Sequence, residues 1–135
     1  MRTRDWFGMA VAILLGIGPS AYAQALDGSV PMLCALSAVH DCGEWGRCDR
    51  VSAEAANVPH FVRIDVGQGT VSAVGQSRRS APIQQVERRD GRLILQGGQE
   101  SRAWSILIAG ESGALSATVL DESSVIAMFG TCTVP

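Results

Sequence analysis

The sequence contains no lysine, two histidines and only 5% aromatic residues, and the missing lysine narrows the range of partners. Every basic residue is an arginine, and residues 24–135 hold 9 basic against 12 acidic side chains, a net charge near −3. Nucleic acids and anionic membrane surfaces are bound through basic patches, which attract negatively charged partners. The charge balance therefore gives no reason to expect either of them as a partner.

Apolar runs long enough to span a bilayer are also lacking. The apolar stretch near the N-terminus covers residues 9–17, whereas about 30 Å of hydrocarbon takes roughly 20 residues to cross. This stretch follows Arg2 and Arg4 and precedes an A-x-A site at residues 21–23, which is the order of segments in a secretory signal peptide. We predict a signal peptide over residues 1–23, with cleavage before Gln24, and a single domain over residues 24–135. The mature protein would then be periplasmic or secreted, without a membrane span.

Catalytic motifs are missing as well. No serine lies in a G-x-S-x-G turn, which presents the nucleophile of many hydrolases, and neither His40 nor His60 lies in a recognisable catalytic context. The glycine-rich stretches at residues 67–69 and 97–98 precede no expected helix, although a phosphate-binding loop depends on a helix N-terminus. We interpret them as hairpin turns and predict a non-enzymatic protein that needs no cofactor.

Four cysteines follow the predicted signal peptide, at positions 34, 42, 48 and 132. An even number of cysteines in an exported chain indicates disulfides. Cys34, His40, Cys42 and Cys48 lie close together in the sequence, but their C-x5-H-x-C-x5-C spacing does not match the paired C-x2-4-C motifs of structural zinc sites. We therefore predict disulfides and no metal site.

Three pairings of these cysteines are possible, and the spacing favours one of them. Cys42 and Cys48 flank a turn-like stretch over residues 43–47, where a local bridge is easy to form. The remaining pair, Cys34 with Cys132, would join the first strand of the domain to the last. This pairing is expected if those two strands are neighbours, as they are in a closed barrel.

Short apolar or alternating runs, separated by turn residues, fill residues 61–133. The turn signals recur at intervals of roughly ten residues, a spacing typical of an all-β barrel or sandwich. One of the runs, residues 81–87, is predicted to form a single strand, and Asp90–Gly91 is predicted to form a tight turn after it. Residues 32–42 suit either a helix or a strand, and we predict a strand because it allows a Cys42–Cys48 hairpin; Ser52 is expected to cap one helical turn. The fold prediction is a small antiparallel meander that closes into an approximately eight-stranded barrel with a disulfide-stapled N-terminal segment. A β-sandwich is the alternative.

Alternation along the predicted strands also indicates which side chains face the interior. Eight strands enclose a space that side chains just fill or that holds one small ligand. A hollow barrel would place the small side chains of Ala73, Ala117 and Ala127 inward. The expected inward apolar set is Val62, Ile64, Val66, Trp104, Ile106, Ile108, Leu115, Val119 and Phe129.

Basic residues are dense in one part of the chain only. Arginines there lie near strand ends and suit bidentate binding of a carboxylate or phosphate; interleaved acidic residues favour the alternative of a solvated rim of mixed charge. The group comprises Arg78, Arg79, Arg88 and Arg89, with Arg92 and Arg102 nearby.

Trp45, in the loop between Cys42 and Cys48, is the remaining surface candidate. An exposed and rigidly held tryptophan is a common interface anchor. Alternatively it folds back to plug one end of the barrel, which is the interpretation we prefer. The possible interaction surface therefore consists of Trp45, Arg78, Arg79, Arg88 and Arg89.

An export signal, cysteines near both ends of a short β-meander and the lack of a catalytic set resemble the plan of small periplasmic β-barrels of bacteria. These include lysozyme-inhibitor and protease-inhibitor barrels and minimal lipocalin-like proteins. The resemblance is one of architecture and transfers no residue roles. It implies an exported, non-enzymatic binding or inhibitor-like module whose partner is an envelope protein or a small ligand. A structural protein of the envelope, and a small hydrolase or metal-dependent enzyme, are the alternatives.

Overall fold

The computed structural model describes residues 26–75 and 78–135, so the predicted signal peptide and its cleavage site lie outside the described residues. These two ranges contain strands and turns but no helix, which confirms the predicted all-β class. The strands are β1 (Met32–Gly43), β2 (Cys48–Val51), β3 (Phe61–Asp65), β4 (Thr70–Ala73), β5 (Ser80–Pro82), β6 (Gln85–Arg89), β7 (Arg92–Gln99), β8 (Arg102–Ala109), β9 (Ala114–Leu120) and β10 (Ser124–Thr133).

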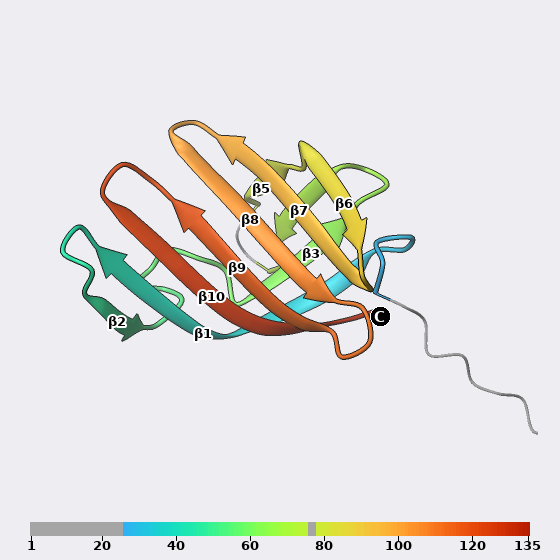
Figure 1. Ribbon diagram of the computed structural model, residues 1–135, viewed down its shortest axis with the longest axis horizontal. Coiled ribbons are helices and arrows are strands. Elements are labelled where there is room, and N and C mark those ends of the chain that lie inside the picture. Colours follow the sequence, from blue (N-terminus) through green and yellow to red (C-terminus); the bar gives the residue numbers. More distant parts are fainter. Residues whose placement is uncertain (1–25, 76–77) are drawn as a thin grey trace, which may run out of the picture.

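All ten strands belong to one curled antiparallel sheet, drawn in Figure 1. The strand order is β5-β4-β3-β1-β10-β9-β8-β7-β6, and β2 pairs with β1 beside this path. Residues 32–43 form a strand, as predicted, and this strand lies between β3 and β10. The first strand is therefore the neighbour of the last, which is the arrangement that the cysteine pattern predicts.

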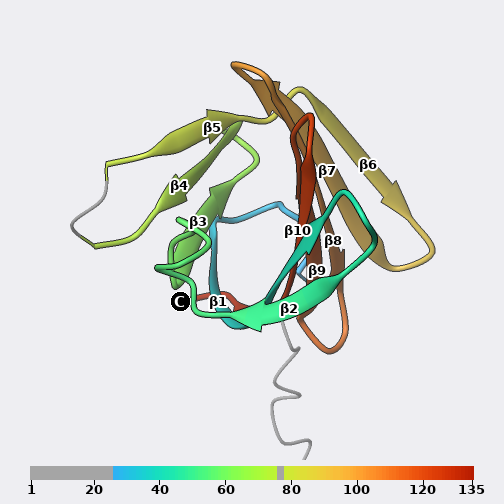
Figure 2. The same ribbon diagram turned by 90° about the vertical axis from the view of Figure 1, so that its left-hand side faces the viewer.

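The two outer strands of the sheet follow one another directly in the chain. Only residues 83 and 84 separate β5 from β6, although these strands stand at opposite ends of the strand order. The N–H of Ile83 donates to the carbonyl of Gly69 at 2.8 Å, beside β4, and the N–H of Gln84 donates to the carbonyl of Gln96 in β7 at 2.9 Å. The chain thus crosses from one side of the curl to the other between β5 and β6, as Figure 2 shows.

This crossing corrects one predicted strand. The expected strand over residues 81–87 is in fact split into β5 and β6. Pro82 ends β5 because proline has no N–H to continue a ladder, and the next two N–H groups bond to different sides of the sheet. The predicted Asp90–Gly91 turn is present, with positive φ at both residues, as a tight two-residue hairpin requires.

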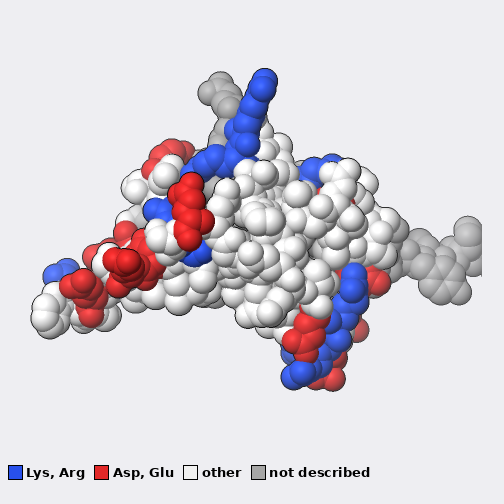
Figure 3. Space-filling model, turned by 90° about the horizontal axis from the view of Figure 1, so that it is seen from above, with Lys and Arg blue, Asp and Glu red and all other residues white. Residues whose placement is uncertain are grey.

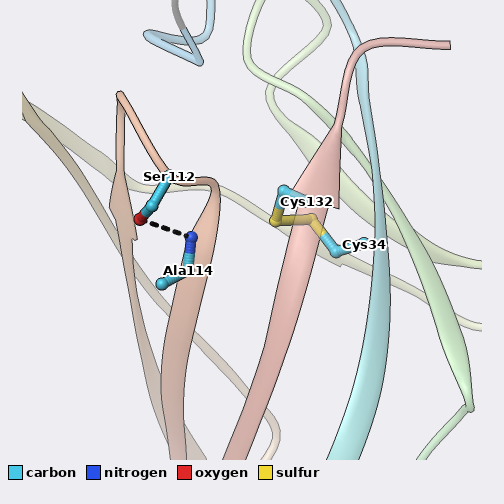
Figure 4. Close-up of a disulfide and its surroundings, with 4 residues drawn as sticks. All are labelled: Cys34, Ser112, Ala114 and Cys132. Carbon is cyan, nitrogen blue, oxygen red and sulfur yellow. Dashed lines mark hydrogen bonds between the residues drawn. A yellow bond between two sulfur atoms is a disulfide. The ribbon is translucent and has the colours of Figure 1, made fainter.

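Both predicted disulfides form. Cys34 and Cys132 are directly opposite residues of β1 and β10, and their bridge joins the first strand to the last (Figure 4). The β8–β9 turn packs beside it: the N–H of Cys132 donates to the carbonyl of Gly113 at 2.8 Å, and the N–H of Ala114 donates to Ser112 Oγ at 3.2 Å. Cys42 and Cys48 close the β1–β2 hairpin.

The core fills the end of the curl that carries the Cys34–Cys132 bridge. Apolar side chains from β1, β3, β7 and β8 are completely or almost completely buried there; the largest are Met32, Ile64, Leu93, Leu95 and Ile108. Leu26, ahead of β1, packs on the same cluster. No buried polar or charged side chain is found in the described residues, so apolar burial is the main stabilising term at this end.

One expected inward residue points the other way. Phe129 is 48% exposed, because β10 turns Met128 and Cys132 inward and side chains alternate along a strand. The Phe129 ring instead meets the ring of His40 on the outer face, with centroids 6.3 Å apart.

The described residues contain no helix that is long and apolar enough to cross a membrane.

Candidate ligand cavity

The end of the curl opposite the Cys34–Cys132 bridge is hollow. A cavity of about 210 Å³ lies between the wall formed by β3, β4 and β5 and the wall formed by β8, β9 and β10. Figure 2 looks into this end of the molecule. Most of its lining is apolar, and the central residues of the lining are Leu36, Val62, Val71, Ala73, Trp104, Ile106, Leu115, Ala117, Val119, Ile126 and Met128.

Small inward side chains explain why this end is hollow. Ala73 in β4 and Ala117 in β9 line the cavity from opposite walls. At the packed end of the sheet, the inward side chains are larger and include isoleucine, leucine and methionine. The hollow interior that these two alanines predict is therefore present. Ala127 does not contribute, because its neighbours Ile126 and Met128 line the cavity and its own side chain points to the outer face.

A turn between β2 and β3 forms part of the rim of the cavity. Ser52 caps it as predicted: the N–H of Ala55 donates to Ser52 Oγ at 3.1 Å, and the N–H of Ala56 donates to the Ser52 carbonyl at 3.1 Å. The turn ends at Asn57, whose φ of 54° is left-handed, a conformation that asparagine tolerates. Residues 56–59 then line the cavity.

Arg79, which lies just before β5, connects this turn to the β4–β5 strand pair. Its Nη1 donates to the carbonyl oxygen of Asn57 at 2.8 Å and to Asn57 Oδ1 at 3.2 Å. The carbonyl of Arg79 accepts from the N–H of Ala73 at 2.8 Å, which places the backbone of Arg79 beside the end of β4. The rim is thus held by a charge-assisted hydrogen bond to a backbone carbonyl, a stronger bond than a neutral pair makes.

Arg102 contributes a second positive charge, from the opposite wall. It is the first residue of β8, exposed, and lines the cavity. The pKa of the nearby Asp121 carboxyl lies below its usual value, first because the N–H groups of Ser123 and Ser124 donate to it and to a smaller extent because of the Arg102 charge. Arg79 and Arg102 are the two ionisable side chains among the lining residues.

Trp104 forms much of the inner wall. Its ring packs against Gly97, where a Cβ would lie only 2.5 Å from the indole. Its Nε1 is buried and, among the described residues, has no hydrogen-bond partner. The indole lines a cavity whose remaining lining is mostly apolar, so its fluorescence should respond to a molecule that enters the cavity.

Glu54, inside the rim turn, and His60, which follows the turn, form an exposed ion pair. The hydrogen bond from His60 is the largest of the influences that lower the pKa of Glu54 from 4.5 to about 2, followed by the backbone N–H of Glu54 and the hydroxyl of Ser52. Ser52 and His60 therefore both form hydrogen bonds with the carboxylate of Glu54. A catalytic triad would instead place the histidine between the serine and the acid.

This pair gives a pH prediction for the rim. Because the Glu54 pKa is lowered on folding, its stabilising effect should be complete above pH 4.5 and should fade as the pH drops through about 2. NMR titration of the Glu54 carboxyl carbon should give a midpoint near 2, and His60→Ala should move the midpoint back toward 4.5. An unchanged midpoint in that variant would show that His60 does not hold the carboxylate; the carboxyl of Asp121, whose pKa is lowered by the N–H groups of its own turn, serves as the internal control in the same spectra.

The structure does not bring the five predicted surface residues together. Trp45 stands at the tip of the β1–β2 hairpin with 91% of its surface exposed, so the preferred interpretation, that it plugs the barrel, is wrong. The Cys42–Cys48 bridge closes the base of this hairpin. The alternative, that Trp45 is an interface anchor, stays a prediction.

The arginine pairs lie at separate places. Arg88 Nε donates to the carbonyl of Asp27 at 2.7 Å, and Arg89 pairs with Glu87 at 2.5 Å. These two residues therefore belong to a rim of mixed charge on β6, as the alternative interpretation predicts. Arg78 is exposed beside Arg79 in the β4–β5 connection, but of the two only Arg79 lines the cavity.

Charge is distributed unevenly over the rest of the surface. Figure 3 shows charged side chains gathered in clusters, mainly acidic at the left and of both signs at the lower right, which are separated by broad uncharged areas. On the outer face of the sheet, β8, β9 and β10 present uncharged side chains along their lengths, including exposed Leu107, Leu120 and Phe129. This uncharged outer face is the second surface that stands out.

Only part of the cavity lining could be predicted from sequence patterns. Arg102 and Ala117 carried usable signals, a basic residue at a strand start and a small residue in an inward position. The rim turn at residues 56–59 and the inward Ile126 were missed, because their positions depend on how β3 and β10 curve around β1. Within the described residues, no cluster of histidine, cysteine and acidic side chains could hold a metal ion, and all four cysteines are in disulfides.

No protein-family model, no curated protein and no solved structure matches this chain.

Proposed function

We propose that this protein is an exported, non-enzymatic binding module that holds a small apolar molecule in the cavity at the open end of its sheet. The observation that carries the proposal is the cavity itself, which has a volume of about 210 Å³ and a mostly apolar lining. Protein interiors are close-packed and contain few voids larger than a water molecule. A hollow of this size, next to a fully packed end, is the expected form of a ligand site.

Export is supported by two features of the chain. The N-terminal residues have the order of segments of a secretory signal peptide, and both disulfides suit an oxidising compartment outside the cytoplasm. Small ligand sites are typically concave and mostly apolar, with a few placed polar groups. The side chains of Asn57, Arg79 and Arg102 supply such groups at the rim.

Filling the cavity tests the proposal. The probe is octan-1-ol, and the readouts are calorimetry and the fluorescence of Trp104 in a full-length Trp6→Phe/Trp45→Phe background. Ala117→Phe should abolish octan-1-ol binding, because the new ring occupies the space between Ile106 and Met128, the residues that flank Ala117 in the ladder. Unfolding measurements on the same variant should show a stable protein, since the ring enters existing space.

Ala127→Phe is the matched control, because it adds the same ring to the outer face of the neighbouring strand. Octan-1-ol should bind this variant as it binds the parent. Ala73→Leu, on the opposite wall, repeats the test if the phenylalanine in β9 prevents folding. If octan-1-ol fails to bind the parent, or binds the cavity-filled and control variants equally, the proposal is wrong.

A further inference from the structure

We propose that the molecule held in the cavity is a single-chain amphiphile with a carboxylate head group, whose apolar chain enters the cavity and whose head group lies between Arg79 and Arg102. This inference rests on the proposed function and adds the chemical class of the ligand. It is argued from the charges at the rim, from the engagements of the neighbouring acidic residue and from the size of the cavity.

The charge of the rim is the first argument. Apolar residues form most of the cavity lining, and the two ionisable residues in it are both arginine. They come from opposite walls, Arg79 from the residue before β5 and Arg102 from the start of β8. The chain as a whole carries a net charge of −2, so a purely positive rim does not follow from its composition. Guanidinium groups bind carboxylates with two parallel hydrogen bonds.

The acidic residue near this rim is already engaged. Asp121 Oδ1 accepts hydrogen bonds from the N–H of Ser123 at 3.0 Å, from the N–H of Ser124 at 2.9 Å and from Ser124 Oγ at 3.1 Å. Its carboxylate therefore holds the β9–β10 turn together. It feels the charge of Arg102 but does not line the cavity, so a ligand carboxylate reaches Arg102 from the cavity side without displacing it.

The arginine on the other wall is held in place at the rim. Nη1 of Arg79 donates to the carbonyl oxygen of Asn57 and to its Oδ1. These bonds fix the position of the guanidinium plane at the rim. A charged group held in place in this way loses little side-chain entropy when it binds a ligand, which favours affinity.

The size of the cavity sets the length of the chain. A closed apolar cavity of about 150 Å³ takes benzene, which has six carbon atoms. A cavity of about 210 Å³ scales to about eight carbon atoms. The part of the ligand that lies inside the cavity therefore corresponds to a medium-length acyl chain.

The test compares three probes with the same octyl chain: octanoate, octan-1-ol and octyltrimethylammonium. Affinities are measured by Trp104 fluorescence and calorimetry on the full-length Trp6→Phe/Trp45→Phe protein at neutral pH. Octanoate should bind about tenfold more tightly than octan-1-ol, the gain expected from one charge-assisted contact, and octyltrimethylammonium should bind most weakly. Octanoate affinity should fall with added salt, whereas octan-1-ol affinity should not.

Arg102→Gln assigns the effect to the rim. This variant should weaken octanoate binding about tenfold and leave octan-1-ol binding unchanged. Arg63→Gln is the matched control: Arg63 lies on β3 between inward Val62 and Ile64 and is exposed on the outer face. That variant should bind both probes as the parent does.

The outcomes separate the ligand class from the function. If octan-1-ol binds the cavity but octanoate binds no more tightly, and Arg102→Gln changes neither, the carboxylate proposal is overturned and the apolar binding function stands. If Arg102→Gln weakens both probes equally, Arg102 shapes the cavity rather than binding a head group, and the proposal is likewise overturned. If none of the three probes binds, both the ligand class and the proposed function fail.

Discussion

Replacing Cys34 and Cys132 together by alanine is expected to lower the free energy of unfolding by about 4–5 kcal/mol. The bridge joins residues 98 positions apart, and in the chain-entropy model the stabilisation grows with the length of the closed loop. Domains of this size are stable by only about 5–15 kcal/mol. The variant should therefore unfold at a much lower denaturant concentration, or be largely unfolded at room temperature.

The second disulfide provides the comparison. Cys42 and Cys48 are 6 positions apart, so the same model gives about 2 kcal/mol for the Cys42→Ala/Cys48→Ala variant. Guanidinium unfolding of the three proteins, analysed by linear extrapolation, measures both losses. Equal losses for the two bridges would show that loop length does not determine their contributions and that local packing around Cys34, which is completely buried, dominates instead.

Gly97→Ala is expected to destabilise the protein by about 3 kcal/mol, at the upper end of the range for overpacked sites. A Cβ at position 97 would lie 2.5 Å from the carbonyl oxygen of Pro82 and 2.5 Å from the Trp104 ring. The carbonyl oxygen belongs to the backbone just before the β5–β6 crossing, and the indole of Trp104 is packed against Gly97. Neither can move without opening the place where the two outer strands meet.

Gly98→Ala is a sharp control for this prediction. Both glycines lie outside the left-handed region, so alanine is conformationally allowed at either one. At position 98 the nearest atom to a new Cβ is the Arg102 carbonyl oxygen, at 3.3 Å, which requires only a small shift. Gly98→Ala should stay within about 1 kcal/mol of the parent, since alanine in a strand also recovers backbone entropy. Similar unfolding midpoints for the two variants would mean that the crossing is not tightly packed.

The features that could be predicted from the sequence are those that depend on local alternation and on the cysteines. Val62 and Ile64 are buried, as their alternation indicates. The turn-like stretch between Cys42 and Cys48 predicted the bridge between those two cysteines and left Cys34 to pair with Cys132, and both bridges are confirmed. Phe129 was placed wrongly although a signal was available. Cys132 is bridged and buried, so alternation along β10 turns the even-numbered positions inward.

The features that could not be predicted depend on contacts between distant segments. Pro82 marked a possible strand end, but nothing local shows that the two following N–H groups bond to opposite sides of the sheet. The cavity has the same origin. Arg79 and Arg102 belong to different walls, and they face one hollow only because β1 lies between β3 and β10 and curls the sheet around them.

The position of β1 between β3 and β10 also determines the order in which the molecule can fold. The β1–β2 hairpin and the β6–β10 meander contain local contacts and can form as soon as they are synthesised. The partner of β1 on its other edge is the last strand of the chain, so the ladder from Leu33↔Thr133 to Gly43↔Ser124 must wait for all the intervening strands. Contacts of such long sequence separation slow folding and leave a strand edge exposed meanwhile. The local Cys42–Cys48 bridge can thus form early, whereas the Cys34–Cys132 bridge can form only after β1 has paired with β10.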